Sequence, residues 1–138
     1  LLGSLKKMNL LCSKNLKEIP DLSNARNLEE LDLEGCESLV TLPSSIQNAI
    51  KLRKLHCSGM ILIDLKSLEG VRNLEYLLVD NWSSMEGTQG IVYFPSKLRL
   101  LSWNNCPLKR LHSNFKVEYL VKLRMENSDL EKLWDGTQ

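Results

Sequence analysis

The sequence predicts an α/β solenoid, a curved right-handed coil with short parallel strands on its concave face and loops and short helical turns on its convex side. Two observations lead to this fold class. Apolar residues recur in one template, L-x-x-L-x-L-x-x-(C/S)-x-x-L-x-x-(L/I)-P, and copies of that template follow one another along the whole chain. A single copy cannot bury its own apolar face, whereas stacked copies bury a continuous column.

Six copies of the template have their first positions at residues 5, 28, 52, 74, 98 and 120. Successive starts lie 23, 24, 22, 24 and 22 residues apart, within the period of about 20–29 residues that is typical of leucine-rich repeats. The clearest copy comprises Leu28, Leu31, Leu33, Cys36, Leu39, Leu42 and Pro43. We expect residues 1–138 to form one leucine-rich-repeat domain that is a piece of a longer array, with further chain covering both ends.

Each template position has a physical reason. The alternation L-x-L has a period of two, so it predicts a short strand in which Leu31 and Leu33 point into the core and Asp32 points out. The Cys or Ser position follows where the chain turns away, and a small side chain there can approach backbone groups of the neighbouring turn. Pro43 ends regular hydrogen bonding as the coil closes.

The convex side has one segment typical of a short helix, Ser44 to Ile50. Ser44 is the expected N-cap, and Ile46 and Ile50 lie one helical turn apart, so both should face the core. The segment from Leu65 to Val71 is a second candidate. Trp82 and Trp103 fall at inward positions of the template, and we expect both in the core.

Composition and charge exclude several function classes. The 138 residues carry a formal net charge of +1, with 43% hydrophobic and 25% charged residues. This balance gives no reason to expect nucleic acid or a membrane surface as a partner. No apolar run reaches the length of about 18 residues that a membrane span needs.

The four cysteines do not predict a metal site or a disulfide. In the repeat register no two of them stack on neighbouring strands, whereas a disulfide needs Cα atoms within about 7 Å. His56 and Cys57 are adjacent on a strand, so they face opposite ways. Four unpaired cysteines fit a reducing compartment, and the triplet Asn81-Trp82-Ser83 is interpreted as a chance glycosylation sequon.

No catalytic group and no cofactor site is expected in this chain. The register brings together no Ser/His/Asp or Cys/His grouping. The sequence also lacks the glycine-rich loop that cradles phosphates. The sequence therefore predicts a binding scaffold and not an enzyme.

The outward positions of the strands are the candidate partner-binding residues, and we call them the strip. Its apolar centre is Tyr76, Leu78 and Leu100, and apolar groups ringed by polar ones are typical of interaction sites. The alternative is a solvated sheet face on which Lys7, Glu30 and Lys54 pair across the strands. The strip consists of Lys7, Glu30, Asp32, Glu34, Lys54, His56, Tyr76, Leu78, Asp80, Leu100, Asn104, Lys122 and Arg124.

Three tails of the repeats are more specific than the template itself. They read NLKEIPDLS from Asn15, CESLVTLPSSI from Cys36 and CPLKRL from Cys106. These phrases resemble plant intracellular immune receptors that carry a TIR domain, a nucleotide-binding domain and C-terminal leucine-rich repeats, and within them the Arabidopsis downy-mildew resistance group. Two departures are His112, where the pattern usually has Pro, and Trp82 at the small position.

The resemblance implies a cytoplasmic or nuclear receptor active in plant defence. In such receptors the repeats help to recognise pathogen effectors and restrain the nucleotide-binding switch. The expected partners are a pathogen effector or host protein and the receptor's own nucleotide-binding domain, with any oligomerisation driven by upstream domains. ADP or ATP and NAD would bind only in those upstream domains, so no cofactor is expected here.

Two other kinds of leucine-rich-repeat protein remain open. A substrate adaptor of a ubiquitin ligase would use the same concave face but would follow an F-box. An extracellular receptor ectodomain usually carries Asn at the turn position and paired capping cysteines, and this chain has neither feature.

Overall fold

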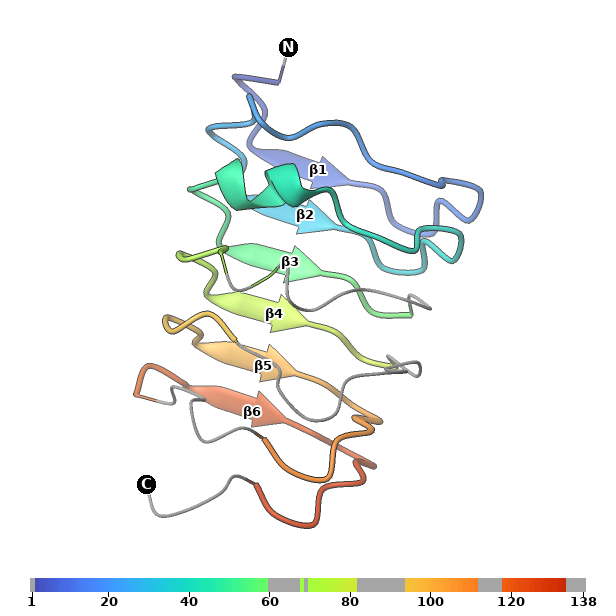
Figure 1. Ribbon diagram of the computed structural model, residues 1–138, viewed down its shortest axis with the longest axis vertical. Helices are drawn as coiled ribbons and strands as arrows, with labels where there is room; N and C mark the ends of the chain where they lie inside the picture. Colours follow the sequence, from blue (N-terminus) through green and yellow to red (C-terminus); the bar gives the residue numbers. More distant parts are fainter. Residues whose placement is uncertain (1, 60–67, 69, 82–93, 112–117, 134–138) are drawn as a thin grey trace.

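The computed structural model describes residues 2–59, 68, 70–81, 94–111 and 118–133. They form an open coil with one three-residue strand per repeat (Figure 1). The strands are β1 (Lys7–Asn9), β2 (Glu30–Asp32), β3 (Lys54–His56), β4 (Tyr76–Leu78), β5 (Leu100–Ser102) and β6 (Lys122–Arg124). They make one six-stranded parallel sheet in chain order, which confirms the predicted leucine-rich-repeat solenoid.

The register of the sheet follows the template. The middle residues Met8, Leu31, Leu55, Leu77, Leu101 and Leu123 are partners from each strand to the next. Because the same template position recurs on each strand, residues 22–24 apart in the chain become neighbours. Parallel pairing with this offset is what aligns the predicted strip in rows across the sheet.

The core is one continuous apolar column behind the sheet. Within the second repeat, Leu28, Leu31, Leu33, Cys36 and Leu39 are all essentially inaccessible to solvent. Burying one leucine side chain contributes roughly 1.5–3 kcal/mol of stability, and the stacking of repeats joins these contributions into one cluster. The small position behaves as predicted, because the Cys36 thiol donates to the Leu10 carbonyl at 3.1 Å.

Trp103 occupies the core at an inward position, as predicted, and is fully buried. Its ring and that of Phe94 form a T-shaped pair with centroids 6.1 Å apart and an interplanar angle of 71°, an arrangement that aromatic pairs favour. The other tryptophan predicted in the core, Trp82, lies outside the described residues.

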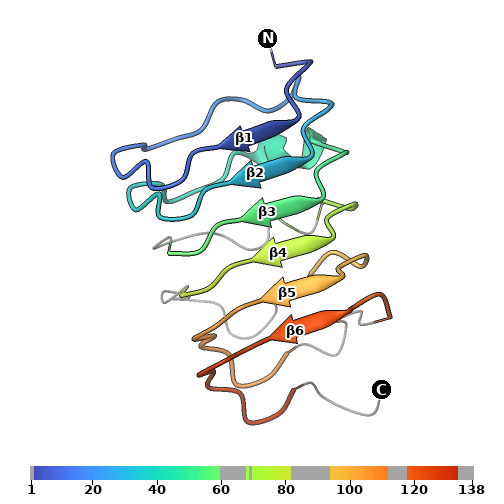
Figure 2. The same ribbon diagram turned by 180° about the vertical axis from the view of Figure 1, so that it is seen from behind.

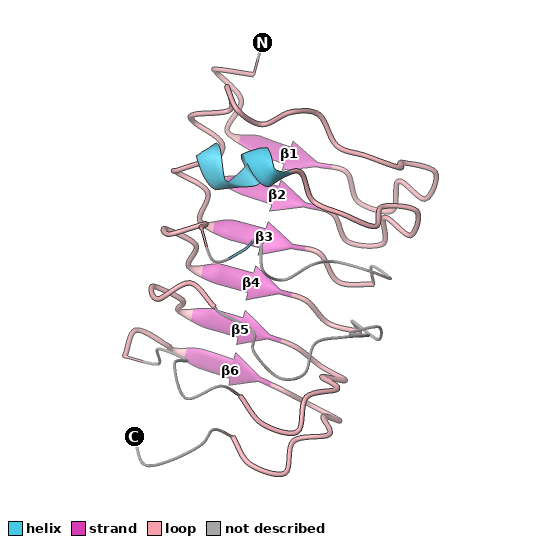
Figure 3. Ribbon diagram, viewed as in Figure 1, coloured by secondary structure: helices cyan, strands magenta, loops and turns pink. Residues whose placement is uncertain are grey.

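The convex segment forms a 3₁₀ helix, η1 (Ser44–Asn48), on the side of the coil opposite the sheet (Figures 2 and 3). The predicted serine cap is wrong: Pro43 holds the N-cap position and no side chain caps the helix. Ile46 is buried as predicted, but Ile50 is 63% exposed and Ala49 is buried in its place. A 3₁₀ turn brings residues i and i+3 onto one face, which selects Ala49.

The second candidate helix, Leu65 to Val71, lies largely outside the described residues, although Leu68 and Val71 are buried. Among the residues that the structure describes, no helix has the length and apolar character of a membrane span.

Each coil leaves its strand through one residue with left-handed backbone. The six residues occupy the same template position, and their φ angles lie between 54° and 74°. Residues other than Gly and Asn adopt this conformation at a cost of roughly 1–2 kcal/mol, because their Cβ crowds the following carbonyl oxygen. Five of the six residues at this position are Gly or Asn: Cys12, Gly35, Gly59, Asn81, Asn105 and Asn127.

Candidate interaction surface

The strip lies on the face of the sheet that points away from the core. Its members come from outward positions of β1–β6 and from the second residue after each of β2, β4 and β5. None of its thirteen residues is buried. The strand alternation therefore leaves the whole predicted strip accessible to a partner, and the side chains within it group into regions of different chemistry.

The first region is an ionic row over β1–β3. The Glu30 carboxylate lies 3.8 Å from the Lys7 Nζ and 3.8 Å from a guanidinium nitrogen of Arg53. The alternative interpretation, a solvated face on which Lys7, Glu30 and Lys54 pair, holds for Lys7 and Glu30, but Arg53 and not Lys54 supplies the second cation. The Arg53 guanidinium also lies 6.0 Å from the centroid of the Tyr76 ring, and this cation–π contact favours its position.

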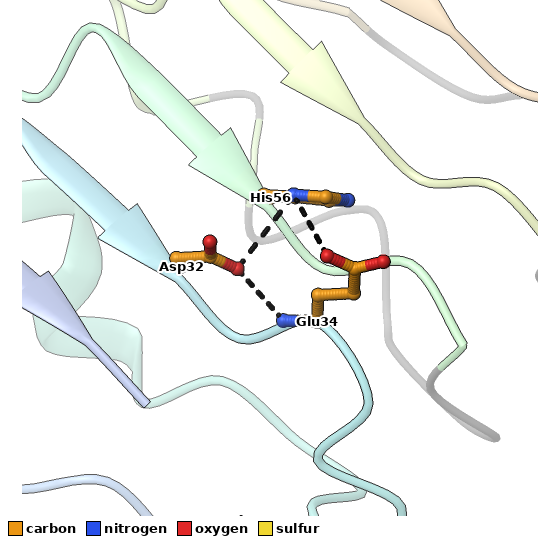
Figure 4. A group of neighbouring side chains, drawn as sticks. All are labelled: Asp32, Glu34 and His56. Atoms are coloured by element: carbon orange, nitrogen blue, oxygen red, sulfur yellow. Dashed lines mark hydrogen bonds and ion pairs between the residues drawn. The ribbon is translucent and has the colours of Figure 1, made fainter. Parts of the chain in front are cut away.

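Three strip residues, Asp32, Glu34 and His56, converge at the ends of β2 and β3, and we call them the His56 cluster (Figure 4). The His56 Nδ1 lies 3.6 Å from the Asp32 Oδ1 and 3.7 Å from the Glu34 Oε2. The Asp32 Oδ1 also accepts the backbone N–H of Glu34 at 3.0 Å. Asp32 and His56 are register partners, so the pairing of neighbouring strands creates this cluster.

The apolar centre of the strip lines a hollow of about 310 Å³, which we call the central cleft. Tyr76 and Leu100 are register partners on β4 and β5, and Leu78 lies beside them. All three are half-buried. The volume lies at the low end of the range of about 300–1,000 Å³ for ligand sites, so it suits one or two side chains of a partner. The cleft is lined by Glu30, Arg53, Lys54, Tyr76, Leu78 and Leu100.

Asp80 and Asn104 use their side chains to link neighbouring coils. The Asp80 Oδ1 accepts the Ser102 hydroxyl at 2.9 Å and the Asn104 N–H at 2.6 Å. The Asn104 Oδ1 accepts the Glu126 N–H at 2.9 Å. Ser102, the partner of Asp80, is only 4% exposed, so this network satisfies a buried hydroxyl and backbone groups, as buried polar groups require.

The last strand adds two cationic strip residues, Lys122 and Arg124, both exposed. The Arg124 Nε lies 3.2 Å from the Glu126 Oε1. Of the groups at the strip, Arg53 is one that sequence reasoning missed. Arg53 comes just before β3, so it is not one of the outward strand positions that define the strip. Its long side chain nevertheless reaches both Glu30 and the Tyr76 ring.

A second hollow of about 720 Å³ lies where the chain enters β4, β5 and β6, and sequence reasoning did not anticipate it. Its rim includes two of the most exposed apolar residues among those described, Tyr119 and Val121. Lys97 on the same rim donates to the Asn73 Oδ1 at 3.0 Å. This hollow is lined by Asn73, Glu75, Lys97, Arg99, Glu118, Tyr119 and Val121.

All four cysteines are free thiols. Burial raises the pKa of the Cys57 and Cys36 thiols, and it raises the pKa of Cys106 to about 11. Since the thiolate is the nucleophile and the metal ligand, these three thiols are chemically quiet in the folded chain. Cys57 packs in the core behind β3, so it is separated from the strip residue His56, as the strand alternation predicted.

Comparison with known proteins agrees with the repeat geometry. A family model described as "Leucine Rich Repeat" matches residues 119–138. The chain is 93% identical to the Arabidopsis thaliana disease resistance protein RPP5 and 79% identical to RPP4 of the same plant, each over 99% of the chain. It is 43% identical over 84% of its length to the Arabidopsis protein SUPPRESSOR OF npr1-1, CONSTITUTIVE 1.

The chain spans about a tenth of the length of these relatives: 9% of RPP5, 12% of RPP4 and 8% of the third protein. The identity over nearly the whole chain agrees with the template, the sheet register and the phrases that resemble plant immune receptors. The chain therefore belongs to the leucine-rich-repeat regions of plant disease resistance proteins.

Proposed function

We propose that this chain is a protein-interaction scaffold of an intracellular plant immune receptor, and that the strip is its contact surface. The observation that carries the proposal is the central cleft. Half-buried Tyr76, Leu78 and Leu100 are bordered there by the charges of Glu30, Arg53 and Lys54. An apolar centre surrounded by polar groups is the composition of binding hot spots.

The charge of the cleft rim indicates which partner groups it would accept. Glu30 already has two cationic neighbours, Lys7 and Arg53, whereas Lys54 is exposed and forms no ion pair among the described residues. Lys54 is therefore available to a carboxylate of the partner. We propose that the partner inserts an apolar or aromatic side chain into the cleft and places an acidic group beside Lys54.

The near identity to RPP5 supports the receptor context. In this context the partner is a pathogen effector, a host protein or the receptor's own nucleotide-binding domain, and the contact contributes to effector recognition and autoinhibition. The full receptor would act in the cytoplasm or the nucleus. Its nucleotide and NAD chemistry would belong to domains outside this chain.

The test places substitutions in the full-length receptor expressed in leaves. Leu100→Glu and Tyr76→Ala change the floor of the central cleft, and Ile50→Glu is a matched control because Ile50 is exposed and does not line the cleft. We expect the cleft variants to abolish the effector-dependent cell-death response or to cause cell death without effector. Immunoblots establish that the variants accumulate equally.

The two outcomes separate a partner outside the receptor, an effector or a host protein, from the receptor's own nucleotide-binding domain. Loss of the effector response alone indicates that the cleft contacts the effector or a host protein, whereas cell death without effector indicates contact with the receptor's own domains. If all three variants accumulate and behave like the unmodified receptor in both assays, the strip is a solvated sheet face and the proposal is wrong.

A further inference from the structure

We propose that the His56 cluster binds a divalent transition-metal cation, with Zn²⁺ as the reference ion. The ligands are the Nδ1 of His56, a carboxylate oxygen of Asp32 and a carboxylate oxygen of Glu34. One ligand atom from each residue lies within 4.8 Å of the other two. This proposal is independent of the partner of the central cleft.

The spacing of the ligand atoms fits a tetrahedral ion. Zn–N and Zn–O bonds of about 2.0–2.2 Å place the ligand atoms of a tetrahedral site about 3.4 Å apart. The His56 Nδ1 is 3.6 Å from the Asp32 oxygen and 3.7 Å from the Glu34 oxygen. The two pairs that include His56 therefore lie within a few tenths of an ångström of this spacing, and all three ligand atoms lie within 4.8 Å of one another.

The charge of the cluster favours a cation. Among the residues that the structure describes, no lysine or arginine forms an ion pair with Asp32 or Glu34, although Glu30 on the same strand has two cationic partners. With a neutral imidazole, the three side chains carry a formal charge of −2. A divalent ion neutralises this charge and takes the imidazole lone pair as well.

The fold orients the ligands before any ion arrives. Asp32 and His56 face each other across paired strands whose opposite sides are fixed in the core by Leu31 and Leu55. The Glu34 N–H holds the Asp32 carboxylate at 3.0 Å, and the His56 side chain is only 18% exposed. Hydrogen bonds of this kind to the ligands and a rigid backbone raise metal affinity.

The donor set selects the class of ion. An imidazole with two carboxylates suits Zn²⁺ and its first-row neighbours, whereas Mg²⁺ and Ca²⁺ prefer six or more oxygen ligands. Three protein ligands would leave a tetrahedral ion one further position, for water or for a side chain of a bound partner.

The first experiment is calorimetric titration of ZnCl₂ into the full chain, with reducing agent that does not chelate metals. We expect one Zn²⁺ per chain and at least a tenfold weaker affinity for each of His56→Gln and Asp32→Asn. Glu37→Gln, Cys12→Ser and His112→Gln are matched controls that remove an exposed carboxylate, the exposed thiol and the other histidine, and they should bind as the unmodified chain does.

Glu34→Gln is an independent variant, because Glu34 is the most exposed ligand and its loss should leave the fold intact. Circular dichroism compares the folding of all variants without metal, and excess Zn²⁺ should raise the melting temperature of the unmodified chain but not of the ligand variants. The proposal is wrong if the unmodified chain binds no Zn²⁺, if the folded ligand variants bind as tightly as the unmodified chain, or if Mg²⁺ competes at equal concentration.

Discussion

The two halves of the sheet, β1–β3 and β4–β6, share the same backbone pairing but differ in what their outward side chains bind. Over β1–β3, Lys7, Glu30, Asp32, Glu34 and His56 lie beside other ionisable side chains, in the ionic row around Glu30 and in the His56 cluster. Over β4–β6, Asp80 and Asn104 bond to backbone N–H groups and to a buried hydroxyl. Glu34, Asp80 and Asn104 hold the same template position. The Glu34 side chain is available to a ligand, whereas those of Asp80 and Asn104 hold neighbouring coils together.

The left-handed position shows the same division. The first three repeats place Cys12, Gly35 and Gly59 there, and the last three place asparagine. The Asn105 side-chain amide donates to the Asn81 Oδ1 of the preceding repeat, so asparagine adds a bond between coils that glycine cannot make. The comparison teaches that one side-chain position of the template can stabilise the coil or be left to function without any change of backbone.

The largest loss of stability should come from truncating a core leucine, and it should be similar in both halves of the sheet because both share one core. Leu31→Ala and Leu77→Ala remove equally buried side chains from β2 and β4. Each should lower the free energy of unfolding by about 2–5 kcal/mol, measured by urea denaturation. A difference between them well beyond that spread would show that the two halves do not share one cooperative core.

The second largest loss of stability should differ between the two halves of the sheet. Asp80→Ala leaves the nearly buried Ser102 hydroxyl and the Asn104 N–H without their acceptor, at a cost of about 1–3 kcal/mol. Asp32→Ala removes an acceptor for one exposed N–H and should cost less. Equal losses of stability in urea denaturation would contradict the division between the two halves.

Glycine substitutions test the left-handed position within the first half. Alanine in place of either glycine should lower stability by about 1–2 kcal/mol because of the backbone conformation alone. A Cβ at Gly35 would also lie 2.9 Å from the Cys12 Sγ, whereas at Gly59 its nearest neighbour is 3.8 Å away. We therefore expect Gly35→Ala to melt at a lower temperature than Gly59→Ala, and Cys12→Ser to reduce that difference.

Alkaline pH should weaken the folded chain through Cys106. Burial raises the pKa of this thiol from 9.0 to about 11, so the folded state holds the proton that the unfolded state releases. The stability from this group is complete below pH 9 and is lost progressively as the pH rises to 11, by roughly 1 kcal/mol at pH 10. Urea denaturation at pH 8 and pH 10 should show a smaller decrease for Cys106→Ala than for the unmodified chain.

The smallest loss of stability should come from removing an ion pair of the ionic row. The side chains of the Lys7–Glu30 pair are 72% and 29% exposed, and an exposed pair of this kind contributes about 0–1 kcal/mol. Lys7→Ala should therefore change the melting temperature little, and 1 M NaCl should abolish the change. A loss comparable to that of Asp80→Ala would show that the first half also depends on its strip for stability.

The strands and their register could be predicted from the sequence because the template period fixes both. Leu31 and Leu55 are paired since they hold the same position in consecutive copies. The convex side was harder, because a 3₁₀ turn at Ser44–Asn48 depends on how Ala49 and Ile46 pack, not on the spacing of the isoleucines. No local sequence pattern distinguishes a 3₁₀ turn that buries Ala49 from an α-helical turn that buries Ile50.

The candidate site was predicted as a set of positions, but the interactions among them were not. Long side chains choose partners that the register does not specify, as Arg53 does in place of Lys54. The His56 cluster could have been found, since Asp32 and His56 are one repeat apart and share a template position. As a possible metal ligand, His56 was considered only together with its chain neighbour Cys57, whose side chain faces the core.

The register described above has a consequence for how such a surface can change by recombination. Two residues that touch across neighbouring strands are separated by one whole repeat, so deleting or duplicating a repeat exchanges the neighbours of the strip residues at the junction and leaves the other cross-strand pairs as they are. An inserted repeat between β2 and β3 would leave the coil intact and separate Asp32 from His56. Contacts on the strip of this array can therefore be gained or lost in units of one repeat.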